Sequence, residues 1–364
     1  MTTFLKAKKI DIFYNPDIKI NYSDYFQIDL AKDKSIKKIL IIKWGGMGDI
    51  IQSTAIINDI LENFKSSKIH VNTRPAWKEL FSNEKRIANV WGFNFRKNIF
   101  ALKDILKWVG KVNAEKYDLI IDLQTNDRSR IVLTLLKFLF LSKSKLIGNH
   151  PIFPYSNVSK KAAYGSINLM QRTIASIGII PKNIKPIIKL NKKNKEKAKT
   201  LMRKNGLLNK NFFIFIPGAS KGNMLKRWGV KNFLELTKLL NKTVVLIGGA
   251  DDLDDCHMIA QENNTIVNLC GKTTLLELLE IFKNCSYVIG NDTGTLHLAS
   301  ATNVPTIQIA GPTNPLLVKP STNNVISVQA DIDCKNCYQK NCSHHSCMKN
   351  ITADYIYSII KDTK

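Results

Sequence analysis

The stretch that decides the fold is Lys38-Ile-Leu-Ile-Ile-Lys43, followed directly by Trp44-Gly-Gly-Met-Gly-Asp49. Its first half is a continuous apolar run rich in β-branched residues, which is typical of a strand buried on both faces of a parallel sheet. Its second half is a glycine-rich turn, and a helical pattern of apolar residues starts at Ile50. Strand, turn and helix in this order predict the first unit of an α/β fold.

The same alternation continues along the chain. Strands are predicted at 69–72, 118–123 and 145–147, then at 212–216, 243–247, 266–269, 287–289 and 305–309, with helical patterns such as 228–240 and 274–282 between them. Such alternation predicts parallel sheets with right-handed crossovers, and the polar stretch 181–210 divides them into two sets. We therefore expect a two-lobed α/β protein, with ligands at the carboxyl ends of the strands and a cleft between the lobes.

Length and composition agree with this expectation. A chain of 364 residues is about right for two domains, and 44% hydrophobic with 23% charged residues is typical of a folded, soluble protein. No apolar run reaches the roughly 18 residues that a membrane span needs. The first residues lack the compact apolar stretch of a secretory signal, so a cytoplasmic location is expected.

The net charge indicates which kinds of molecule the protein would bind. Lys and Arg number 54 against 29 Asp and Glu, which gives +25. A field of this sign attracts nucleic acid, anionic lipid, or nucleotide and phosphorylated substrates. Lysine dominates arginine, whereas nucleic-acid readers favour the arginine fork, and the sequence contains no recognised RNA module. We therefore expect no nucleic-acid partner.

The first candidate site is the turn from Gly45 to Asp49. Glycines such as Gly46 and Gly48 after a first strand let the backbone approach a ligand closely, and Asp49 would lie at the mouth of the cleft. A dinucleotide fingerprint needs a further glycine three residues after Gly48, so NAD binding is disfavoured. Two interpretations of Asp49 stay open: a helix N-cap and a catalytic base.

The second candidate site is Pro217-Gly-Ala-Ser220, which ends a predicted strand and is followed by Lys226-Arg-Trp228. A loop of small residues after a strand suits a phosphate, with Ser220 as a donor and Lys226 supplying charge. The spacing is not that of a Walker A loop. In a chain so rich in lysine, a surface role for Lys226 stays equally open.

The third candidate site is Gly290-Asn-Asp-Thr-Gly-Thr-Leu-His297, which follows a predicted strand and opens a helix. The exposed amides of that helix start would receive a pyrophosphate, helped by the helix dipole. Side-chain donors and charges come from the same segment: Asp292, Thr293, Thr295 and His297, with Gly294 at the turn. Gly311-Pro-Thr-Asn-Pro315 follows the next strand and would line the same place.

These four motifs, in this order, resemble those of glycosyltransferase family 9, the ADP-heptose:lipopolysaccharide heptosyltransferase family. The likeness runs from about Lys38 to the C-terminus. It implies a GT-B fold of two Rossmann-like lobes, with the acceptor on the N-terminal lobe and the nucleotide-sugar on the C-terminal lobe. It also implies an inverting transfer that requires no metal.

The resemblance assigns roles to individual residues. Asp49 matches the family's proposed general base, and Lys226 matches the residue that neutralises the departing diphosphate. Asp292, Thr293, Gly294 and His297 match the donor-phosphate loop, and Asp251 is a weaker match for the nucleoside ribose. Asp122-Leu-Gln-Thr-Asn-Asp-Arg128 resembles the segment that faces the acceptor. Arg128 or Arg130 would then bind an acceptor phosphate or carboxylate, with an idle surface arginine as the alternative.

The expected domains follow. Residues 1–36 are an irregular extension without clean periodicity, 37–185 the acceptor-binding lobe, 186–330 the nucleotide-sugar-binding lobe, and 331–364 a cysteine-rich segment with a final helix. In GT-B proteins such a helix tends to pack on the N-terminal lobe. Asn314, where the family commonly has Asp, and Asn168, where it often has His, leave the identity of the sugars open.

The seven cysteines form two groups. Three of them, Cys256, Cys270 and Cys285, are scattered and are expected in the core. The others lie close together in the sequence and suit either a structural zinc or iron, or unligated thiols that brace the final loop: Cys334, Cys337, Cys342 and Cys347. No cofactor is expected for catalysis.

The sequence therefore favours an inverting glycosyltransferase that moves a sugar, heptose from ADP-heptose in the best-known case, onto a lipopolysaccharide core or related glycan. Its basic surface predicts peripheral contact with the anionic inner face of the cytoplasmic membrane. The alternatives are a relative that uses another nucleotide-sugar or a protein or polysaccharide acceptor, a non-catalytic nucleotide-sugar binder, and a nucleic-acid binder.

Overall fold

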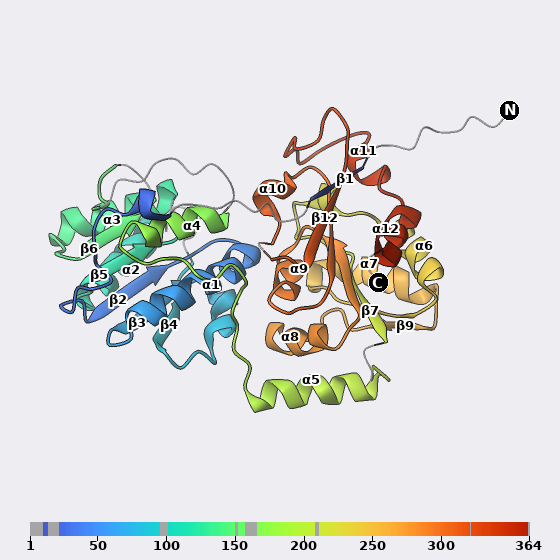
Figure 1. Ribbon diagram of the computed structural model, residues 1–364, viewed down its shortest axis with the longest axis horizontal. Helices are drawn as coiled ribbons and strands as arrows, with labels where there is room; N and C mark the ends of the chain where they lie inside the picture. The colour runs from blue at the N-terminus through green and yellow to red at the C-terminus, as the bar shows by residue number, and fades with distance from the viewer. Residues whose placement is uncertain are drawn as a thin grey trace. The chain divides into compact units, whose positions relative to one another are not determined.

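The computed structural model describes residues 10–13, 22–94, 101–124, 126–149, 152–156, 166–207, 211–320 and 322–362. The chain folds into two compact units, Asp17–Lys189 and Met1–Pro16 with Leu190–Lys364 (Figure 1). The division after Lys189 falls within the polar stretch that separates the two predicted sets of strands. We call the two parts the N-terminal unit and the C-terminal unit.

The N-terminal unit is built on a parallel sheet of five strands in the order β4-β3-β2-β5-β6. The strands are β2 (Lys38–Ile42), β3 (Lys68–Thr73), β4 (Ile87–Gly92), β5 (Leu119–Asp122) and β6 (Lys145–Gly148). The helices are α1 (Met47–Asn63), α2 (Ala101–Ala114), α3 (Asp127–Phe140) and α4 (Ser166–Ala175), with short 3₁₀ turns η1 (Tyr22–Tyr25) and η2 (Pro75–Phe81).

The C-terminal unit has a seven-stranded sheet in the order β1-β12-β11-β10-β7-β8-β9. Its strands are β1 (Ile10–Phe13), β7 (Phe212–Ile216), β8 (Thr243–Leu246), β9 (Ile266–Asn268), β10 (Tyr287–Asn291), β11 (Thr306–Ala310) and β12 (Val325–Ala330). The helices are α5 (Lys192–Lys204), α6 (Val230–Leu240), α7 (Leu253–Gln261), α8 (Leu275–Lys283), α9 (Gly294–Ala299), α10 (Pro315–Val318), α11 (Ser346–Lys349) and α12 (Ala353–Asp362). Two 3₁₀ turns are η3 (Met224–Lys226) and η4 (Ala250–Asp252).

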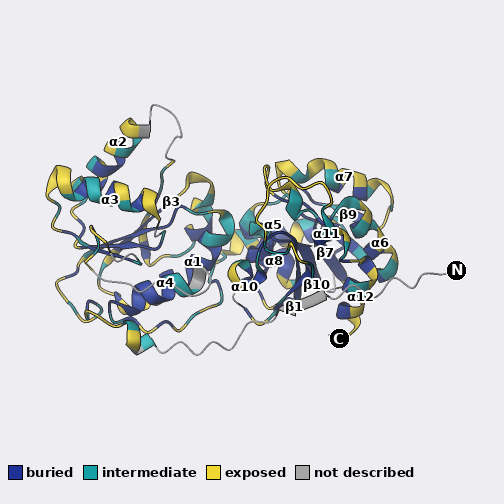
Figure 2. Cartoon of the chain, turned by 90° about the horizontal axis from the view of Figure 1, so that it is seen from above, coloured by how far each residue is buried: buried dark blue, intermediate teal, exposed yellow. Residues whose placement is uncertain are grey.

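Both units confirm the α/β prediction. The central strands are buried on both faces, and Figure 2 shows them in dark blue. Crossover helices cover a parallel sheet on both sides, and its strands are therefore continuous apolar runs. No helix among the described residues is long and apolar enough to cross a membrane.

The N-terminal extension differs from the expectation. We expected residues 1–36 to be irregular, but Ile10–Phe13 forms β1, which pairs antiparallel with Ser327–Ala330 at the edge of the C-terminal sheet. Residues from Asp17 onward belong instead to the N-terminal unit. Four residues are too few to show periodicity, and their pairing partner lies more than 300 positions away in the sequence.

The end of the chain packs within the C-terminal unit. The described part of 331–364 belongs to this unit, and α12 packs against α6. Packing of this helix on the N-terminal lobe stays a prediction. Ile356 and Ile360 are buried in the same core as Phe233, and the Trp228 indole donates to the Ile351 carbonyl at 2.7 Å. The apolar face of α12 is therefore satisfied within its own unit.

Candidate active site

The loops after β7 and β10 are joined by one buried side chain, Asn291. Its amide donates to the carbonyls of Pro217 and Gly218 at 2.6 and 3.0 Å, and its oxygen accepts from the Trp228 amide at 3.1 Å. Asn291 therefore holds the Pro217–Ser220 loop and the Lys226–Trp228 segment beside the end of β10. The strand order, with β10 next to β7, explains why motifs 70 residues apart in the sequence meet.

The next residue, Asp292, collects four polar side chains. Its Oδ2 accepts from Lys226 Nζ at 2.6 Å and from Thr313 Oγ1 at 3.0 Å. Its Oδ1 accepts from Gln308 Nε2 at 2.9 Å and lies 3.9 Å from His297 Nε2. The carboxylate is 6% exposed, so the Lys226 ammonium is held in place by a nearly buried charge.

The start of α9 presents backbone donors at this point. Thr293 caps the helix, and its hydroxyl accepts from the Leu296 amide at 3.4 Å. Within the described part of the chain, no group accepts from the amides of Gly294 and Thr295. Free amides at a helix start, with an ammonium nearby, form an arrangement that can bind an anion such as a phosphate.

Ser220 and Asp251 lie on adjoining loops of the same unit. Ser220 is exposed and its hydroxyl accepts from Asn223, whereas Asp251 accepts from the Lys221 amide at 3.1 Å. Both loops are tied together by Arg227, which donates to the carbonyls of Ala219 and Asp251. In the described part of the chain, no hydrogen bond or ion pair joins Ser220 or Asp251 directly to Asp292.

Arg227 and Asp252 organise these loops and were not predicted. Arg227 forms ion pairs with Asp255 at 2.6 Å and with Asp252 at 3.4 Å. Asp252 packs so closely against Gly218 that a Cβ there would meet its Oδ1 at 1.8 Å, which explains the glycine in that loop. Burial raises the pKa of Asp252, and the nearby Arg227 charge opposes that shift.

In the N-terminal unit, Asp49 lies in the first turn of α1, directly after the glycine-rich turn. Its Oδ2 accepts from the Gly46 amide at 3.2 Å, so the carboxylate does cap the helix. Among the described residues no donor reaches Oδ1. The capping and base interpretations are therefore compatible, because the cap occupies only one oxygen.

Lys43 and Asp122 lie at the ends of the neighbouring strands β2 and β5, beneath the turn that carries Asp49. Lys43 is 4% exposed and donates to the Leu123 carbonyl at 3.0 Å. Burial lowers the pKa of Lys43, and the negative charges of Asp49 and Asp122 oppose that shift. Asp122 is fully buried and accepts from Tyr155 at 2.6 Å. No pattern in the sequence marks Lys43, which reads only as a lysine at the end of a buried strand.

The other residues predicted to bind the acceptor are exposed or half-buried. Gly46 is exposed and Gly48 is half-buried in the turn. Arg128 is exposed on α3, and Arg130 pairs with Asp127 at 3.2 Å within the same turn. Burial and the Asp122 carboxylate raise the pKa of the half-buried Tyr155, whereas the positive charge of Arg130 opposes that shift.

The predicted metal site is not assembled. Cys334, Cys337 and Cys342 are exposed, Cys347 is buried, and all four thiols are free. Burial, together with the other three thiols, raises the pKa of Cys347 to about 11. Among the described residues, however, no three His, Cys, Asp or Glu side chains lie close enough to hold a metal ion. The residues present therefore do not fit the ion, and the other three cysteines lie in the core as expected.

The cysteine-rich segment does brace the candidate site. His345 Nε2 lies 2.7 Å from the carbonyl of Leu225, next to Lys226. The Asn314 amide donates to the Tyr338 hydroxyl at 3.2 Å, and a Cβ on Gly311 would meet Met348 at 2.9 Å. His345, Tyr338 and Met348 thus connect the cysteine-rich segment to the loops of the candidate site, and a bracing role of the thiols themselves stays a prediction.

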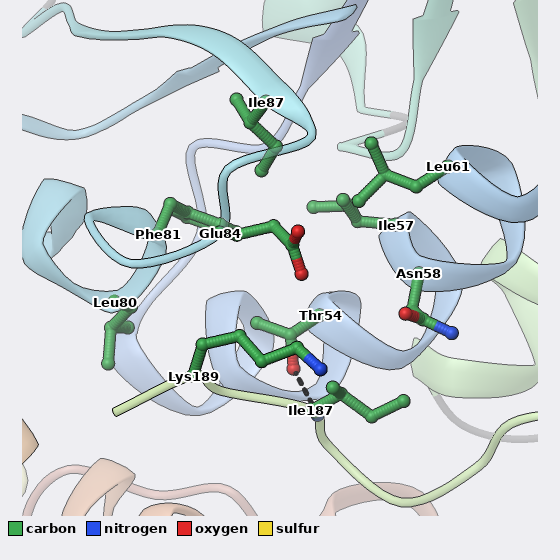
Figure 3. Close-up of a pocket in the computed structure, with 10 residues that line it drawn as sticks. All are labelled: Thr54, Ile57, Asn58, Leu61, Leu80, Phe81, Glu84, Ile87, Ile187 and Lys189. Carbon is green, nitrogen blue, oxygen red and sulfur yellow. Dashed lines mark hydrogen bonds between the residues drawn. The ribbon is translucent and has the colours of Figure 1, made fainter. Parts of the chain in front are cut away.

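A small pocket with about 10 Å³ of free space, room for about one water molecule, lies elsewhere in the N-terminal unit, between α1, η2 and the segment that leads to Lys189 (Figure 3). Its lining is largely apolar, and Thr54 accepts from the Ile187 amide at 2.9 Å. None of its lining residues belongs to a predicted motif. We assign it to the packing of the connecting segment on α1.

Two parallel-sheet units with polar motifs at the carboxyl ends of their strands are the architecture of a GT-B glycosyltransferase, and the comparisons agree. The family model "Glycosyltransferase family 9 (heptosyltransferase)" matches residues 105–348. Lipooligosaccharide heptosyltransferase 2 from Campylobacter jejuni is 26% identical over 337 residues, 86% of this chain and 95% of the relative.

Two solved structures share the fold. The crystal structure of a family 9 glycosyltransferase from Veillonella parvula superposes with a TM-score of 0.77 at 18% identity, covering 90% of this chain and 96% of that one. Escherichia coli ADP-heptose lps heptosyltransferase II gives a TM-score of 0.69 at 20% identity, covering 89% and 98%. The chain is a glycosyltransferase with two Rossmann-like lobes. It belongs to glycosyltransferase family 9.

Proposed function

We propose that the protein transfers heptose from ADP-heptose to a lipopolysaccharide core or a related glycan, with inversion at the anomeric carbon and without a catalytic metal. The observation that carries the proposal is the Lys226–Asp292 pair at the free amides of α9, which suits a diphosphate leaving group. The names of the Campylobacter jejuni relative and of the Escherichia coli structure support heptose and ADP-heptose.

On the donor side, the proposed reaction needs charge stabilisation. The bond between the anomeric carbon and the diphosphate oxygen breaks, and the leaving ADP keeps the electron pair. Lys226 and the amides of Gly294 and Thr295 would stabilise the charge that develops there. Ser220, Thr293, Thr295 and His297 would add contacts to the phosphates, and Asp251 would contact the ribose of the donor nucleoside.

On the acceptor side, Asp49 would act as the general base. It would take the proton of an acceptor hydroxyl while that oxygen forms the new bond to the anomeric carbon, on the face opposite the diphosphate. Lys43, buried beneath the turn, would balance the negative charges of Asp49 and Asp122. Gly46 and Gly48 would let the acceptor approach the backbone, and Arg128 or Arg130 would bind an anionic group of the acceptor.

Location follows from the acceptor. A lipopolysaccharide core is built on a lipid anchor, so we propose a cytoplasmic enzyme in peripheral contact with the inner face of the membrane. The net charge of +25 supports contact with anionic lipid.

A second candidate function keeps the reaction but changes the sugar or the acceptor. Asn314, where the family commonly has Asp, favours it. Its side chain caps α10 at 3.0 Å from the Leu316 amide, beside the loop that carries Thr313. A changed group at this place would alter contacts with the donor.

Thermal unfolding with a panel of ligands tests the proposal. A ligand that binds only the native state raises the melting temperature by mass action. We expect ADP and ADP-heptose to raise it more than UDP-glucose, with EDTA making no difference. A preference for a different nucleotide would favour the second candidate, and no shift with any nucleotide would contradict the assignment of the Asp292–His297 loop.

A further inference from the structure

The end of α3 in the N-terminal unit exposes large apolar side chains. Phe138, Leu139 and Leu141 are 68%, 53% and 83% exposed. The opposite face of the helix is already packed, because Leu133 and Leu136 are fully buried in the core of the unit. Figure 2 shows α3 with buried and exposed segments on the same helix. The exposed residues are therefore not needed by the core.

A second segment extends this surface. Ile152 and Phe153, in the loop after β6, are each 54% exposed, and the ring of Phe153 lies 5.6 Å from the ring of Phe138. We call the surface made by the two segments the α3 patch: Phe138, Leu139, Phe140, Leu141, Ile152 and Phe153. Exposed apolar side chains that form one contiguous patch indicate an interaction site, whereas single scattered ones are common on any surface.

The segments that carry the α3 patch are basic in sequence. From Arg128 to Phe153 the chain contains five Lys or Arg and no Asp or Glu, although Lys145 pairs with Asp33 at 3.0 Å. Lys143, two residues beyond Leu141, is exposed. Lys137 donates to the carbonyls of Ser142 and Ser144 at 2.7 and 2.8 Å, which fixes its ammonium at the same end of the helix.

We propose that the α3 patch is the surface through which the protein docks on an anionic phospholipid membrane. Aromatic and aliphatic side chains would enter the boundary between headgroups and acyl chains, while Lys143 would reach the lipid phosphates. A second copy of the chain is disfavoured as the occupant, since it would bring the same positive charges face to face. The surface serves the glycolipid acceptor of the proposed function, but its assignment depends only on the patch.

Flotation of the full chain with vesicles tests the assignment. We expect binding to vesicles that contain phosphatidylglycerol and much weaker binding to pure phosphatidylcholine. Phe138→Ser with Leu141→Ser should weaken binding at least about tenfold, because two exposed apolar side chains lose their burial. Lys143→Gln should weaken it about fivefold, on anionic vesicles alone. Met258→Ser on α7, where Met258 is 48% exposed, is the matched control and should bind normally.

Three results would overturn the assignment. They are no binding of the wild-type chain to anionic vesicles, unchanged binding by the double variant with an unchanged melting temperature, and a shift in oligomeric state caused by the double variant. Transfer to a water-soluble acceptor separates this proposal from the enzymatic one. The double variant should retain this transferase activity. If the wild-type chain has no transferase activity but still binds vesicles through the α3 patch, only the proposed function is contradicted.

Discussion

Lys226 Nζ lies 2.6 Å from Asp292 Oδ2, although 66 positions separate the two residues in the sequence. The carboxylate is nearly buried, whereas the lysine side chain keeps 22% exposure. The ammonium is thus anchored on one side and accessible on the other. This arrangement suits a positive charge that must meet a leaving diphosphate at a fixed position.

Replacing Lys226 tests this role. Lys226→Met should lower kcat by about 10²–10³, the usual effect of removing one preorganised group that stabilises transition-state charge. Steady-state kinetics with the donor varied would measure it. Lys221→Met, on the neighbouring exposed turn, is the control and should leave kcat unchanged. Equal activity of both variants would rule out a leaving-group role for Lys226.

Asp49→Asn separates capping from catalysis. The amide oxygen can still accept from the Gly46 amide, so α1 and the melting temperature should be preserved. Because an amide cannot take up the acceptor proton, transfer should fall by about 10²–10⁴ while donor binding is retained. Asp127→Asn, at an 80% exposed side chain, is the control. An Asp49→Asn variant with wild-type turnover would show that another group is the base.

Asn291→Ala tests the connection between the loops after β7 and β10. The change leaves two buried carbonyls and the Trp228 amide without their partner, so the free energy of unfolding should fall by about 2–4 kcal/mol. Donor affinity should fall with it. Asn284→Ala removes a single half-buried bond to the Glu280 carbonyl and should have a smaller effect. Urea unfolding compares them, and similar losses in both would contradict the connecting role.

Lys319 gives the protein a pH-dependent stability. Burial lowers the pKa of Lys319 from 10.5 to about 8 in the folded state. Above pH 8 the folded state therefore binds fewer protons than the unfolded state, and the free energy of unfolding should rise with pH until about 10.5. The rise should be at most on the order of 3 kcal/mol.

The Lys319→Met variant provides the comparison, since other groups titrate equally in both proteins. The difference in unfolding free energy between wild type and variant should change between pH 7 and pH 10 in favour of the wild type. A constant difference would show that Lys319 keeps its ordinary pKa.

The sequence predicted strands correctly where their hydrophobic pattern matches their burial in the sheet. Continuous apolar runs located β2, β7 and β10, and the motifs after them predicted that Asp292 and His297 share a loop. The pattern missed β4, whose residues alternate irregularly between buried and exposed at the sheet edge. It also missed β12, a strand with polar residues such as Ser327 and Gln329 buried among the site loops.

The supporting groups of the site could not be found from the sequence. Lys43, Arg227 and Gln308 act through contacts with residues 16 to 80 positions away, and neither charge nor spacing marks them. The sequence could not predict that α12 packs against α6, because the apolar surface that α12 covers exists only in the folded C-terminal unit. Thr313 is different, because it lies in the motif Gly311–Pro315 that was expected to line the same site as Asp292. Its hydroxyl, which donates to Asp292, was therefore predictable from the sequence.

The most direct test of the central claim is product analysis by mass spectrometry. The full chain would be incubated with ADP-heptose and a core glycolipid acceptor, in EDTA. The account predicts one added heptose per acceptor together with release of ADP, and neither product with Asp49→Asn. Transfer from another nucleotide-sugar alone, or heptose transfer that Asp49→Asn leaves intact, would contradict it.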